Sequence, residues 1–210
     1  MKPSIKYPHT GHLYWSQSLQ NDDKMIQNMS MLEACRDVVV TEKRDGENST
    51  LGRDFIHARS LDSRNHISRS WVKQLHGSIK HDIPEWMRIC GENLYAVHSI
   101  AYNDLPTYFE VFNIWRDNTC LSWDLTMEWC DLLGLQTVPV LYRGPWNEMI
   151  IRGIIEDKDM NKFEGYVVRI ADSFTIDAFP YSIAKYVRKG HVQTDEHWME
   201  RPVVPNKLKL

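Results

Sequence analysis

A lysine set among charged and turn-forming residues has the clearest chemical potential in this sequence. Lys43 lies in residues 42–48, whose sequence is EKRDGEN. A lysine amine becomes a nucleophile when it loses its proton, so its ordinary pKa of about 10.4 must be lowered. Asp45 and Gly46 tolerate the positive φ of tight turns. The segment therefore predicts a turn that presents a nucleophilic lysine at the end of a strand.

Strands on both sides are expected to position this turn. Residues 38–41 read VVVT, and such a β-branched run favours a buried strand. Residues 49–51 can begin the return strand, with Asp45-Gly46 as a hairpin-type turn. We therefore expect a β-hairpin with Lys43 at its tip.

Composition narrows the class of protein. The chain has 210 residues, of which 42% are hydrophobic and 25% charged, as expected for one globular domain. Its formal net charge of −3 excludes a strongly basic surface overall, so any nucleic-acid contact must come from a local basic patch. The N-terminus lacks the apolar core of a signal peptide, and no apolar run is long enough to cross a membrane, which favours a cytoplasmic protein.

The four cysteines and the order of elements add to this description. Cys35, Cys90, Cys120 and Cys130 form no C-x-x-C pair and are expected to be free thiols in a reducing compartment. Helices are predicted from Asp22 with Met25, Met29 and Leu32 on one face, from Ser70 to Ile79, from Ser122 to Gly134 with Leu125, Trp129, Leu132 and Leu133 as its apolar residues, and from Pro145 to Gly153. Strands are predicted at 87–95, 108–115, 137–142, 163–170, 173–179 and 183–187, followed by an extended tail from 201 to 210. This mixed order predicts an α+β fold with antiparallel sheets.

Charged and aromatic residues recur near the ends of the predicted strands. The sequence contains neither a P-loop nor a G-x-G-x-x-G phosphate loop. Instead, Lys43 is followed by short segments in a fixed order: HARS at 57–60, GENL at 91–94, YFEVFNI at 108–114, FEGYVVR at 163–169 and AKYVRK at 184–189.

This order resembles that of the covalent nucleotidyltransferases, which include polynucleotide ligases and messenger-RNA capping enzymes. Within them the chain is similar to the ATP-dependent RNA ligases, specifically the small bacterial and phage RNA ligase family proteins. K-x-D-G-x-N at 43–48 matches the nucleophile motif, with a final Asn where DNA ligases usually have Arg. Residues 57–60, 91–92, 111–114 and 164–169 resemble the motifs that follow, and residues 6–13 and 191–199 also look like this subgroup.

The resemblance implies a fold and a domain plan. The expected fold has two antiparallel sheets flanking a nucleotide groove, with peripheral helices. Residues 1–210 are expected to form a single adenylyltransferase domain without an OB-fold, in which 1–36 are a lead segment and helix, 37–190 the catalytic core and 191–210 a tail.

The resemblance also implies roles in which Lys43 attacks the α-phosphorus of ATP. Glu92 is suited to accept hydrogen bonds from ribose hydroxyls, and Phe112 to stack on adenine. The implied catalytic residues are Lys43, Asp45, Glu164 and Lys185, and the implied nucleotide-binding residues are Glu42, Lys43, Asn48, Arg59, Glu92, Phe112, Glu164, Lys185 and Arg188. Mg²⁺ or Mn²⁺ is expected at Glu164 and Asp45 through water. AMP would pass to an RNA 5′-phosphate, and a 3′-hydroxyl would displace it, in RNA repair with help from a partner enzyme.

The carboxylates expected around Lys43 require that nearby cations lower its pKa. Lowering a lysine pKa from about 10.4 to about 7.5 costs about 4 kcal/mol. Asp45 and Glu164 alone would raise that pKa, so cations such as Lys185, Arg59 or the metal must lower it. Many relatives have Lys-x-Lys in the fifth motif, whereas here the next cation after Lys185 is Arg188. These two would lie on opposite faces of a strand without a bulge, so the partner of Lys185 stays open, as do the roles of His9 and His12.

RNA contacts are expected from two basic clusters. The first cluster, interleaved with Trp71, consists of Arg59, Arg64, His66, Arg69 and Lys73. The second consists of Lys185, Arg188, Lys189 and His191. The residues expected to contact RNA are Arg64, Arg69, Lys73, Lys189 and His191. The first cluster fits a solvated face equally well. Two other functions share this sequence pattern: a minimal DNA ligase or capping-type guanylyltransferase, which Asn48 and the absent OB-fold disfavour, and a non-catalytic nucleotide- or RNA-binding module, which the intact Lys43 disfavours.

Overall fold

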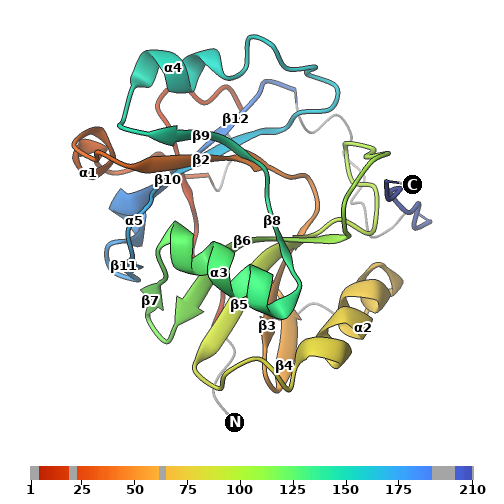
Figure 1. Cartoon of the computed structure of the whole chain (residues 1–210). Coiled ribbons are helices and arrows are strands. Elements are labelled where there is room, and N and C mark those ends of the chain that lie inside the picture. Colours follow the sequence, from red (N-terminus) through yellow and green to blue (C-terminus); the bar gives the residue numbers. More distant parts are fainter. Residues whose placement is uncertain (1–4, 19–22, 62–64, 191–201, 210) are drawn as a thin grey trace.

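Two facing sheets form the body of the protein, which we describe from a computed structural model covering residues 5–18, 23–61, 65–190 and 202–209 (Figure 1). Sheet A has the order β1 (Gly11–His12), β12 (Ile183–Val187), β10 (Gly165–Ile170), β2 (Val38–Lys43) and β9 (Val140–Gly144). Sheet B has the order β11 (Phe174–Thr175), β7 (Thr119–Cys120), β6 (Phe109–Arg116), β5 (Met87–Asn93), β3 (Glu47–Gly52) and β4 (Phe55–Ala58), with β8 (Gln136–Thr137) also paired to β6. The predicted α+β fold with two sheets is confirmed, although the β1–β12 and β6–β8 pairs are parallel.

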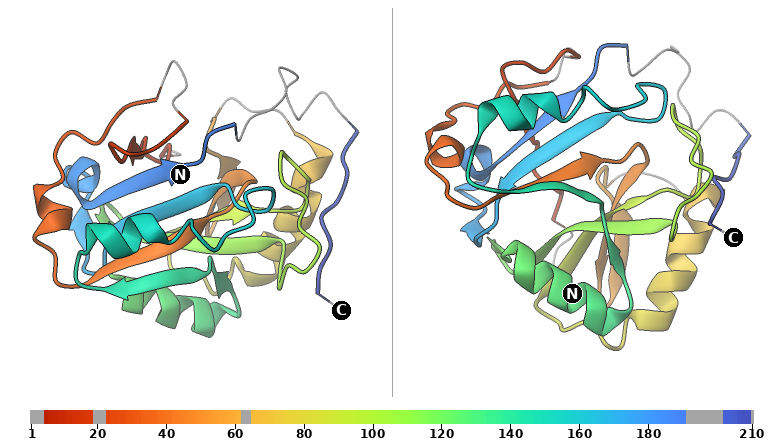
Figure 2. Two further views of the ribbon diagram at one scale, coloured as in Figure 1. Left: turned by 90° about the horizontal axis from the view of Figure 1, so that it is seen from above. Right: turned by 45° about the horizontal axis from the view of Figure 1, so that its top comes forward.

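Helices cover the outer faces of both sheets (Figures 1 and 2). On sheet B, α2 (Ser70–Ile79) and α3 (Trp123–Leu133) contribute apolar residues to the same core as β3, β5 and β6. On sheet A, α1 (Ser30–Glu33) and α4 (Glu148–Gly153) pack on the core formed by β2, β10 and β12. The short helix α5 (Phe179–Ser182) leads directly into β12. Phe179 of α5 packs in a core cluster with Cys90 of β5, Trp115 of β6 and Ile183 of β12, and the site lies in the remaining space between the two sheets.

Strand β2 is buried on both faces, as its β-branched run predicts. Val38 and Val40 pack in the outer core of sheet A, whereas Val39 joins a separate cluster with Trp123. All three valines have no exposed surface. Alternate residues of β2 therefore point toward sheet B, and this places Thr41 and Lys43 on the inner face.

The predicted hairpin around Lys43 is wrong. Strand β2 belongs to sheet A and β3 to sheet B, so residues 44–46 carry the chain from one sheet to the other. Gly46 does not adopt positive φ, and its role is steric: a Cβ there would lie 2.5 Å from the Asn93 carbonyl oxygen. The Asp-Gly pair therefore marks a close crossing between sheets rather than a two-residue hairpin.

The predicted helix start at Asp22 is wrong, whereas the helix predicted from Ser70 to Ile79 is confirmed, with Ser70 as its first residue rather than its cap. Helix α1 is only four residues long, Asp22 lies outside the described residues, and Met25 instead forms a β-bridge with His12. Ser70 is the first residue of α2, and the 3₁₀ turn before it (Ile67–Arg69) is capped by His66, whose ring nitrogen accepts from the Ser68 amide.

The third helix fits its predicted ends better than its predicted face. Ser122 caps α3 by accepting from the Leu125 amide, and Gly134 ends the helix with φ 65°, as predicted. Its buried residues include Trp123 and Cys130, whereas Leu125 and Leu132 are exposed.

The later elements are shorter than predicted. Pro145 is not in the first turn of α4, which begins at Glu148 after the cap residue Asn147, although the helix ends at Gly153 as predicted. The predicted strand at 137–142 is divided between β8 and β9, which lie in different sheets, and the one at 173–179 is limited to β11. Residues 202–209 are extended as predicted. No helix in the part of the chain that the structure describes has the length and apolar character needed to cross a membrane.

Candidate active site

A cavity of about 250 Å³ lies between the inner faces of the two sheets. Strands β2, β10 and β12 line it from sheet A, and β3, β5 and β6 from sheet B. Seven of the predicted site residues line this cavity together: Glu42, Lys43, Asn48, Arg59, Glu92, Phe112 and Lys185. Asp45, Glu164 and Arg188 are not among its lining residues.

The register of sheet A brings Lys43 and Glu164 together. Lys43 pairs with Gly165 of β10, so the residue before Gly165 lies beside the lysine. The Lys43 Nζ donates to Glu164 Oε1 in an ion pair whose carboxylate side chain is only 6% exposed. Gly165 allows this approach, because a Cβ there would lie 2.0 Å from the Tyr186 carbonyl oxygen.

The protein alone keeps Lys43 protonated. Burial lowers the pKa of the Lys43 amine, but Glu164, Glu92 and Asp45 offset this, and the pKa is raised overall. The amine is therefore held in place as an ammonium, and it must lose the influence of these carboxylates before it can attack an electrophile.

Glu92 faces the same pair from sheet B. Its Oε1 accepts from the Gly46 amide at 3.1 Å. Burial raises the pKa of Glu92 to about 8; Lys43 lowers it in part, and Glu164 and Asp45 raise it further. Near neutral pH, this carboxyl therefore holds a proton for much of the time.

A β-bulge shapes the apolar end of the cavity. Cys90 pairs with Asn113 and Gly91 with Val111, which leaves Phe112 as the extra residue on β6. Both Phe112 and Asn113 line the cavity as a result, although strict alternation would put them on opposite faces. The ring of Tyr7 lies edge-on to Phe112, with centroids 5.2 Å apart.

Hydrogen bonds among Tyr7, Asn113 and Arg169 fix the residues at this end of the cavity. The Asn113 Nδ2 donates to the Tyr7 hydroxyl at 2.5 Å, and the Arg169 guanidinium donates to Asn113 Oδ1 at 2.6 Å. Arg169 is 2% exposed and also donates to the Leu121 carbonyl at 2.7 Å, so it ties β10 to sheet B. Sequence reasoning assigned no role to Tyr7, Asn113 or Arg169, although all three lie within the quoted motif segments.

The opposite end of the cavity holds a cluster of cationic and acidic groups around Asp23. Asp23 Oδ1 lies 2.9 Å from Lys185 Nζ, 3.1 Å from His12 Nε2 and 3.7 Å from His9 Nε2. Burial lowers the pKa of Lys185, an effect that Asp23 opposes and Lys43 reinforces. His9 lines the cavity, so the two histidines left open by the sequence lie beside Lys185.

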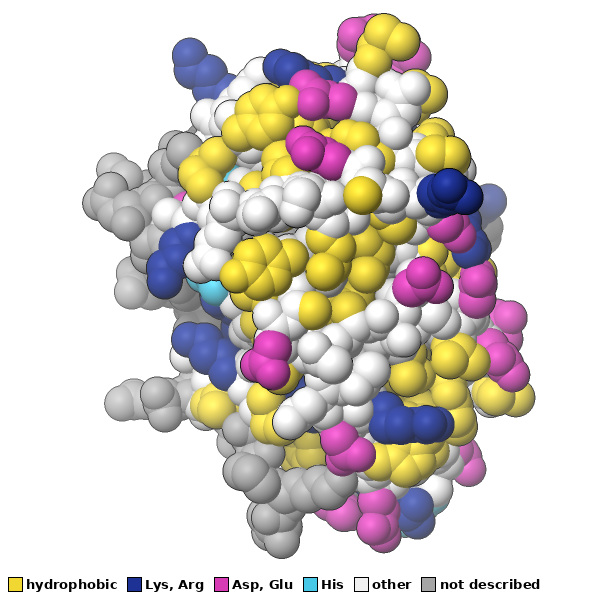
Figure 3. Space-filling model, turned by 90° about the vertical axis from the view of Figure 1, so that its left-hand side faces the viewer, with side chains coloured by type: hydrophobic (Ala, Val, Ile, Leu, Met, Phe, Trp, Pro, Cys, Tyr) yellow, Lys and Arg dark blue, Asp and Glu magenta, His cyan; other side chains and the backbone are white. Residues whose placement is uncertain are grey.

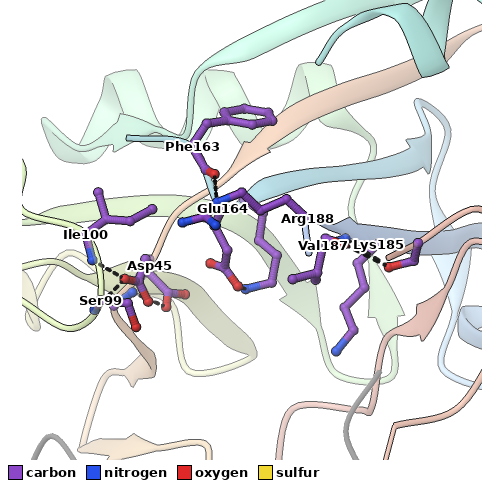
Figure 4. Close-up of polar contacts among 12 residues, drawn as sticks. Asp45, Ser99, Ile100, Phe163, Glu164, Lys185, Val187 and Arg188 are labelled. Carbon is purple, nitrogen blue, oxygen red and sulfur yellow. Dashed lines mark hydrogen bonds and ion pairs between the residues drawn. The ribbon is translucent and has the colours of Figure 1, made fainter. Parts of the chain in front are cut away.

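Arg188 faces away from this cluster. Its Nε donates to the Phe163 carbonyl at 2.8 Å, and its backbone amide donates to the Glu164 carbonyl at 3.0 Å (Figure 4). Arg188 therefore anchors the chain just before β10. This contact supports the position of Glu164 rather than adding a second charge to the cavity.

Asp45 is buried in contacts with the loop that follows β5. Its Oδ2 accepts from the amides of Ser99 and Ile100 at 2.8 and 2.7 Å (Figure 4). Its own amide donates to the Tyr102 hydroxyl at 3.0 Å. The carboxylate thus orders the chain around the nucleophile, and Glu164 is the carboxylate in direct contact with Lys43.

Three more cavity residues, Glu42, Arg44 and Arg59, form hydrogen bonds with neighbours. Arg44 donates to Glu110 Oε2 at 2.8 Å and to Glu42 Oε1 at 2.7 Å. The Glu42 carboxylate is therefore already paired with the Arg44 guanidinium. Arg59 Nε donates to the Tyr7 carbonyl at 3.4 Å. The buried Asn48 Oδ1 has no hydrogen-bond partner among residues of the described ranges, so it is available to a donor on a ligand.

Three of the predicted RNA-contacting residues, Arg69, Lys73 and Lys189, lie in the described part of the chain and differ in exposure. Arg69 is 8% exposed and forms an ion pair with Glu47, while the exposed Lys73 donates to Asn65 at 2.7 Å. Lys189 is exposed, and Arg64 and His191 lie outside the described residues. On the face drawn in Figure 3, basic, acidic and hydrophobic side chains are interspersed.

Preformed metal clusters are absent from the part of the chain that the structure describes. No group of three or more His, Cys, Asp or Glu side chains there could hold an ion. Glu164 and Glu92 nevertheless offer hard carboxylate oxygens beside Lys43. Such a set fits Mg²⁺ or Mn²⁺ that keeps most of its waters and is shared with a phosphate, rather than an ion in a protein cage.

Comparison with known families supplies the context for this geometry. The sequence matches the family described as RNA ligase over residues 36–187. The chain belongs to the RNA ligase family. This confirms the family to which the motifs pointed. Among curated proteins, none matches the sequence significantly.

Solved structures of ligases share the fold. A putative ATP-dependent DNA ligase from Aquifex aeolicus is 20% identical, with a TM-score of 0.57, and the match covers 87% of this chain and 50% of that one. An archaeal ATP-dependent RNA ligase is 17% identical, with a TM-score of 0.60 and coverages of 87% and 48%. An RNA ligase from Naegleria gruberi, solved with PPi, is 18% identical, with a TM-score of 0.54 and coverages of 91% and 63%. The chain thus spans about half to two thirds of the length of these ligases.

Proposed function

We propose that this protein is an ATP-dependent RNA ligase that carries AMP covalently on Lys43. The observation behind this proposal is the position of Lys43. It lies in a cavity between two sheets, paired with Glu164, in a chain of the RNA ligase family. We also propose that residues 37–190 are the adenylyltransferase core of a single domain.

The first step would form a bond between Lys43 Nζ and the α-phosphorus of ATP. The bond from that phosphorus to the bridging oxygen breaks, pyrophosphate leaves, and the amine loses its proton. Glu164 accepts a hydrogen bond from the amine and so orients it. Lys185, on the same face of sheet A, would neutralise charge on the phosphates, and it would have to leave Asp23 to do so.

The base and ribose would bind at the other end of the cavity. Phe112, supported by Tyr7, offers a stacking face for adenine. The same cavity is also lined by Glu42, Asn48, Arg59 and Glu92. Glu92 is placed to accept from ribose hydroxyls when it is ionised, and Asn48 Oδ1 is an acceptor without a hydrogen-bond partner among the residues that the structure describes.

We propose Mg²⁺ or Mn²⁺ as the metal. Structures of the Naegleria gruberi ligase with ATP and Mn, or with AMP and Mn, support a divalent ion. Glu164 would hold it through water, whereas Asp45 would contribute only at longer range, because its Oδ2 accepts two backbone amides. When bound, the metal supplies positive charge that offsets the carboxylates around Lys43.

The substrate is proposed to be RNA with a 5′-phosphate and a 3′-hydroxyl, in repair and with help from a partner enzyme. AMP would move from Lys43 to the 5′-phosphate, and the 3′-hydroxyl would then displace it. Arg64, Lys73, Lys189 and His191 remain the proposed RNA contacts, whereas Arg69 would first have to leave Glu47.

A cytoplasmic location completes the proposal. All four cysteines are free. Burial raises the pKa of Cys90 to about 11 and that of Cys130 to about 12, so these thiols resist the oxidation that thiolates undergo.

A substrate panel tests this function. The protein would be incubated with Mg²⁺, ATP and nicked or single-stranded RNA and DNA with labelled 5′-phosphates. Sealing of RNA ends supports the proposal, and sealing of DNA alone identifies a minimal DNA ligase. Labelling by α-labelled GTP but not by ATP would identify a guanylyltransferase. Nucleotide binding without any adduct would identify a binding module.

A further inference from the structure

The segment at residues 202–209 lies outside the matched family region, yet it is tightly joined to the core. Its centre is Asn206, which is only 3% exposed. The Asn206 Nδ2 donates to the Leu94 carbonyl at 2.7 Å and to the Ala96 carbonyl at 3.3 Å. Its Oδ1 accepts from the Tyr102 amide at 2.8 Å. One side chain thus forms hydrogen bonds with backbone groups at both ends of the loop formed by residues 94–102.

Backbone contacts extend this attachment. The Asn206 amide donates to the Tyr95 carbonyl at 2.8 Å, and the Lys207 amide donates to the Tyr102 carbonyl at 2.9 Å. Isolated β-bridges join Ala96 to Pro205 and Leu105 to Leu208. The loop contains no helix or strand. Its apolar cluster is small, so its order depends on these hydrogen bonds.

The opposite side of the same loop holds the nucleophile turn. Ser99 and Ile100 donate their amides to Asp45 Oδ2, and the Tyr102 hydroxyl accepts from the Asp45 amide. The Arg44 guanidinium lies over the Tyr102 ring, 5.0 Å from its centroid. Both residues that follow Lys43 are therefore fixed by a loop that Asn206 fixes in turn.

We propose that Asn206 is a positioning residue for attack by Lys43 and acts through Tyr102 and Asp45. This inference rests on the proposed lysine adenylylation. The Asn206 side chain touches no cavity-lining residue in the hydrogen bonds described above. Its loss should therefore change the geometry of the lysine turn more than the binding of ATP. Small displacements of a reacting group reduce rates steeply.

Four full-length variants test the proposal. Asn206→Asp keeps the acceptor for Tyr102 but loses the amide donor, and Asn206→Ala loses both. Tyr102→Phe removes only the hydroxyl that accepts from Asp45. Val204→Ala is the matched control, because its side chain is 60% exposed in the same segment. Single-turnover formation of the lysyl adduct would be measured at saturating ATP and at a temperature where circular dichroism shows every variant folded.

We expect Asn206→Ala and Tyr102→Phe each to slow adduct formation by about tenfold or more. The apparent ATP affinity should change by less than about twofold, because Phe112 and Glu92 are untouched. A double variant should be about as slow as the slower single variant, since both changes interrupt one route. Rates within about twofold of wild type in folded Asn206→Ala, or an equal loss in Val204→Ala, would overturn the proposal.

Hydrogen exchange separates this proposal from the proposed function. The amides of Asp45, Ser99 and Ile100 should exchange faster in Asn206→Ala than in Val204→Ala, whether or not the enzyme is active. If wild type forms no adduct with any nucleotide, the proposed function is wrong. The exchange data alone then test whether Asn206 orders the turn through Tyr102 and Asp45. Unchanged protection of these amides in Asn206→Ala would disprove the route even in an active enzyme.

Discussion

The two ends of the cavity are built in different ways. At the apolar end, Phe112 and Tyr7 are held by hydrogen bonds among Tyr7, Asn113 and Arg169, and these groups need not move to receive an aromatic base. At the charged end, Lys43 is paired with Glu164 and Lys185 with Asp23. Each cation there must leave or share a carboxylate before it meets a phosphate.

This difference separates binding from chemistry. A preformed end contributes affinity at little cost in reorganisation. An end made of ion pairs contributes to the rate of the reaction, because its cations act on the ligand only when the ligand's phosphates replace the protein's own carboxylates. Changes at the apolar end should therefore act on ATP binding, and changes at the charged end on the rate of adduct formation.

The largest effect is expected for Lys185→Ala. Loss of a cation that stabilises developing phosphate charge should slow adduct formation by about 10²- to 10³-fold at saturating ATP. Arg188→Ala is the comparison variant, because Arg188 does not line the cavity and only supports the position of Glu164, so a smaller loss is expected. Single-turnover kinetics would measure both, and an equal loss in Arg188→Ala would contradict a separate charge role for Lys185.

A smaller effect, on affinity alone, is expected for Phe112→Leu. The substitution keeps apolar volume but removes the stacking face, which is worth about 1–3 kcal/mol per base, or about tenfold or more in Kd. Equilibrium binding of a non-hydrolysable ATP analogue would measure it. Unchanged affinity with a reduced rate of adduct formation would show that Phe112 acts on the reaction rather than on ATP binding, and would contradict the division between the two ends of the cavity.

The smallest effect concerns stability and Glu92. Its pKa is about 8 in the folded protein and near 4.5 when exposed, so folding favours the protonated form. Unfolding then releases a proton between these values, and stability falls as pH rises from about 4.5 to about 8. Glu92→Gln should therefore gain about 1 kcal/mol or more over wild type at pH 8.5 and little at pH 5. Urea unfolding at both pH values would measure this, with the exposed Glu85→Gln as control. An equal gain at both values would show that Glu92 is not the titrating group.

The motifs predicted the charged end better than the apolar end. Lys43, Glu164 and Lys185 come together because strands pair in a simple register. The bulge that turns both Phe112 and Asn113 into the cavity could not be predicted, since the sequence of β6 alone does not reveal an extra residue against β5.

Other features depended on contacts far apart in sequence. The crossing of the lysine turn between sheets depends on which partners β2 and β3 find, and local turn propensity favoured a hairpin. Asp23 meets Lys185 across 162 residues, and Asn206 meets Tyr102 across 104. Neither pairing leaves a local pattern that a single sequence could display.

The central claim is that Lys43 becomes the carrier of AMP, although the protein alone holds it as an ammonium. The direct test is to incubate wild type, Lys43→Ala and Lys43→Arg with ATP and Mg²⁺, followed by intact mass and peptide mapping. Wild type should gain the mass of one AMP on Lys43 in a bond that is acid-labile and base-stable, and both variants should gain none. An unmodified wild-type protein, or an adduct on any other residue, would contradict the account.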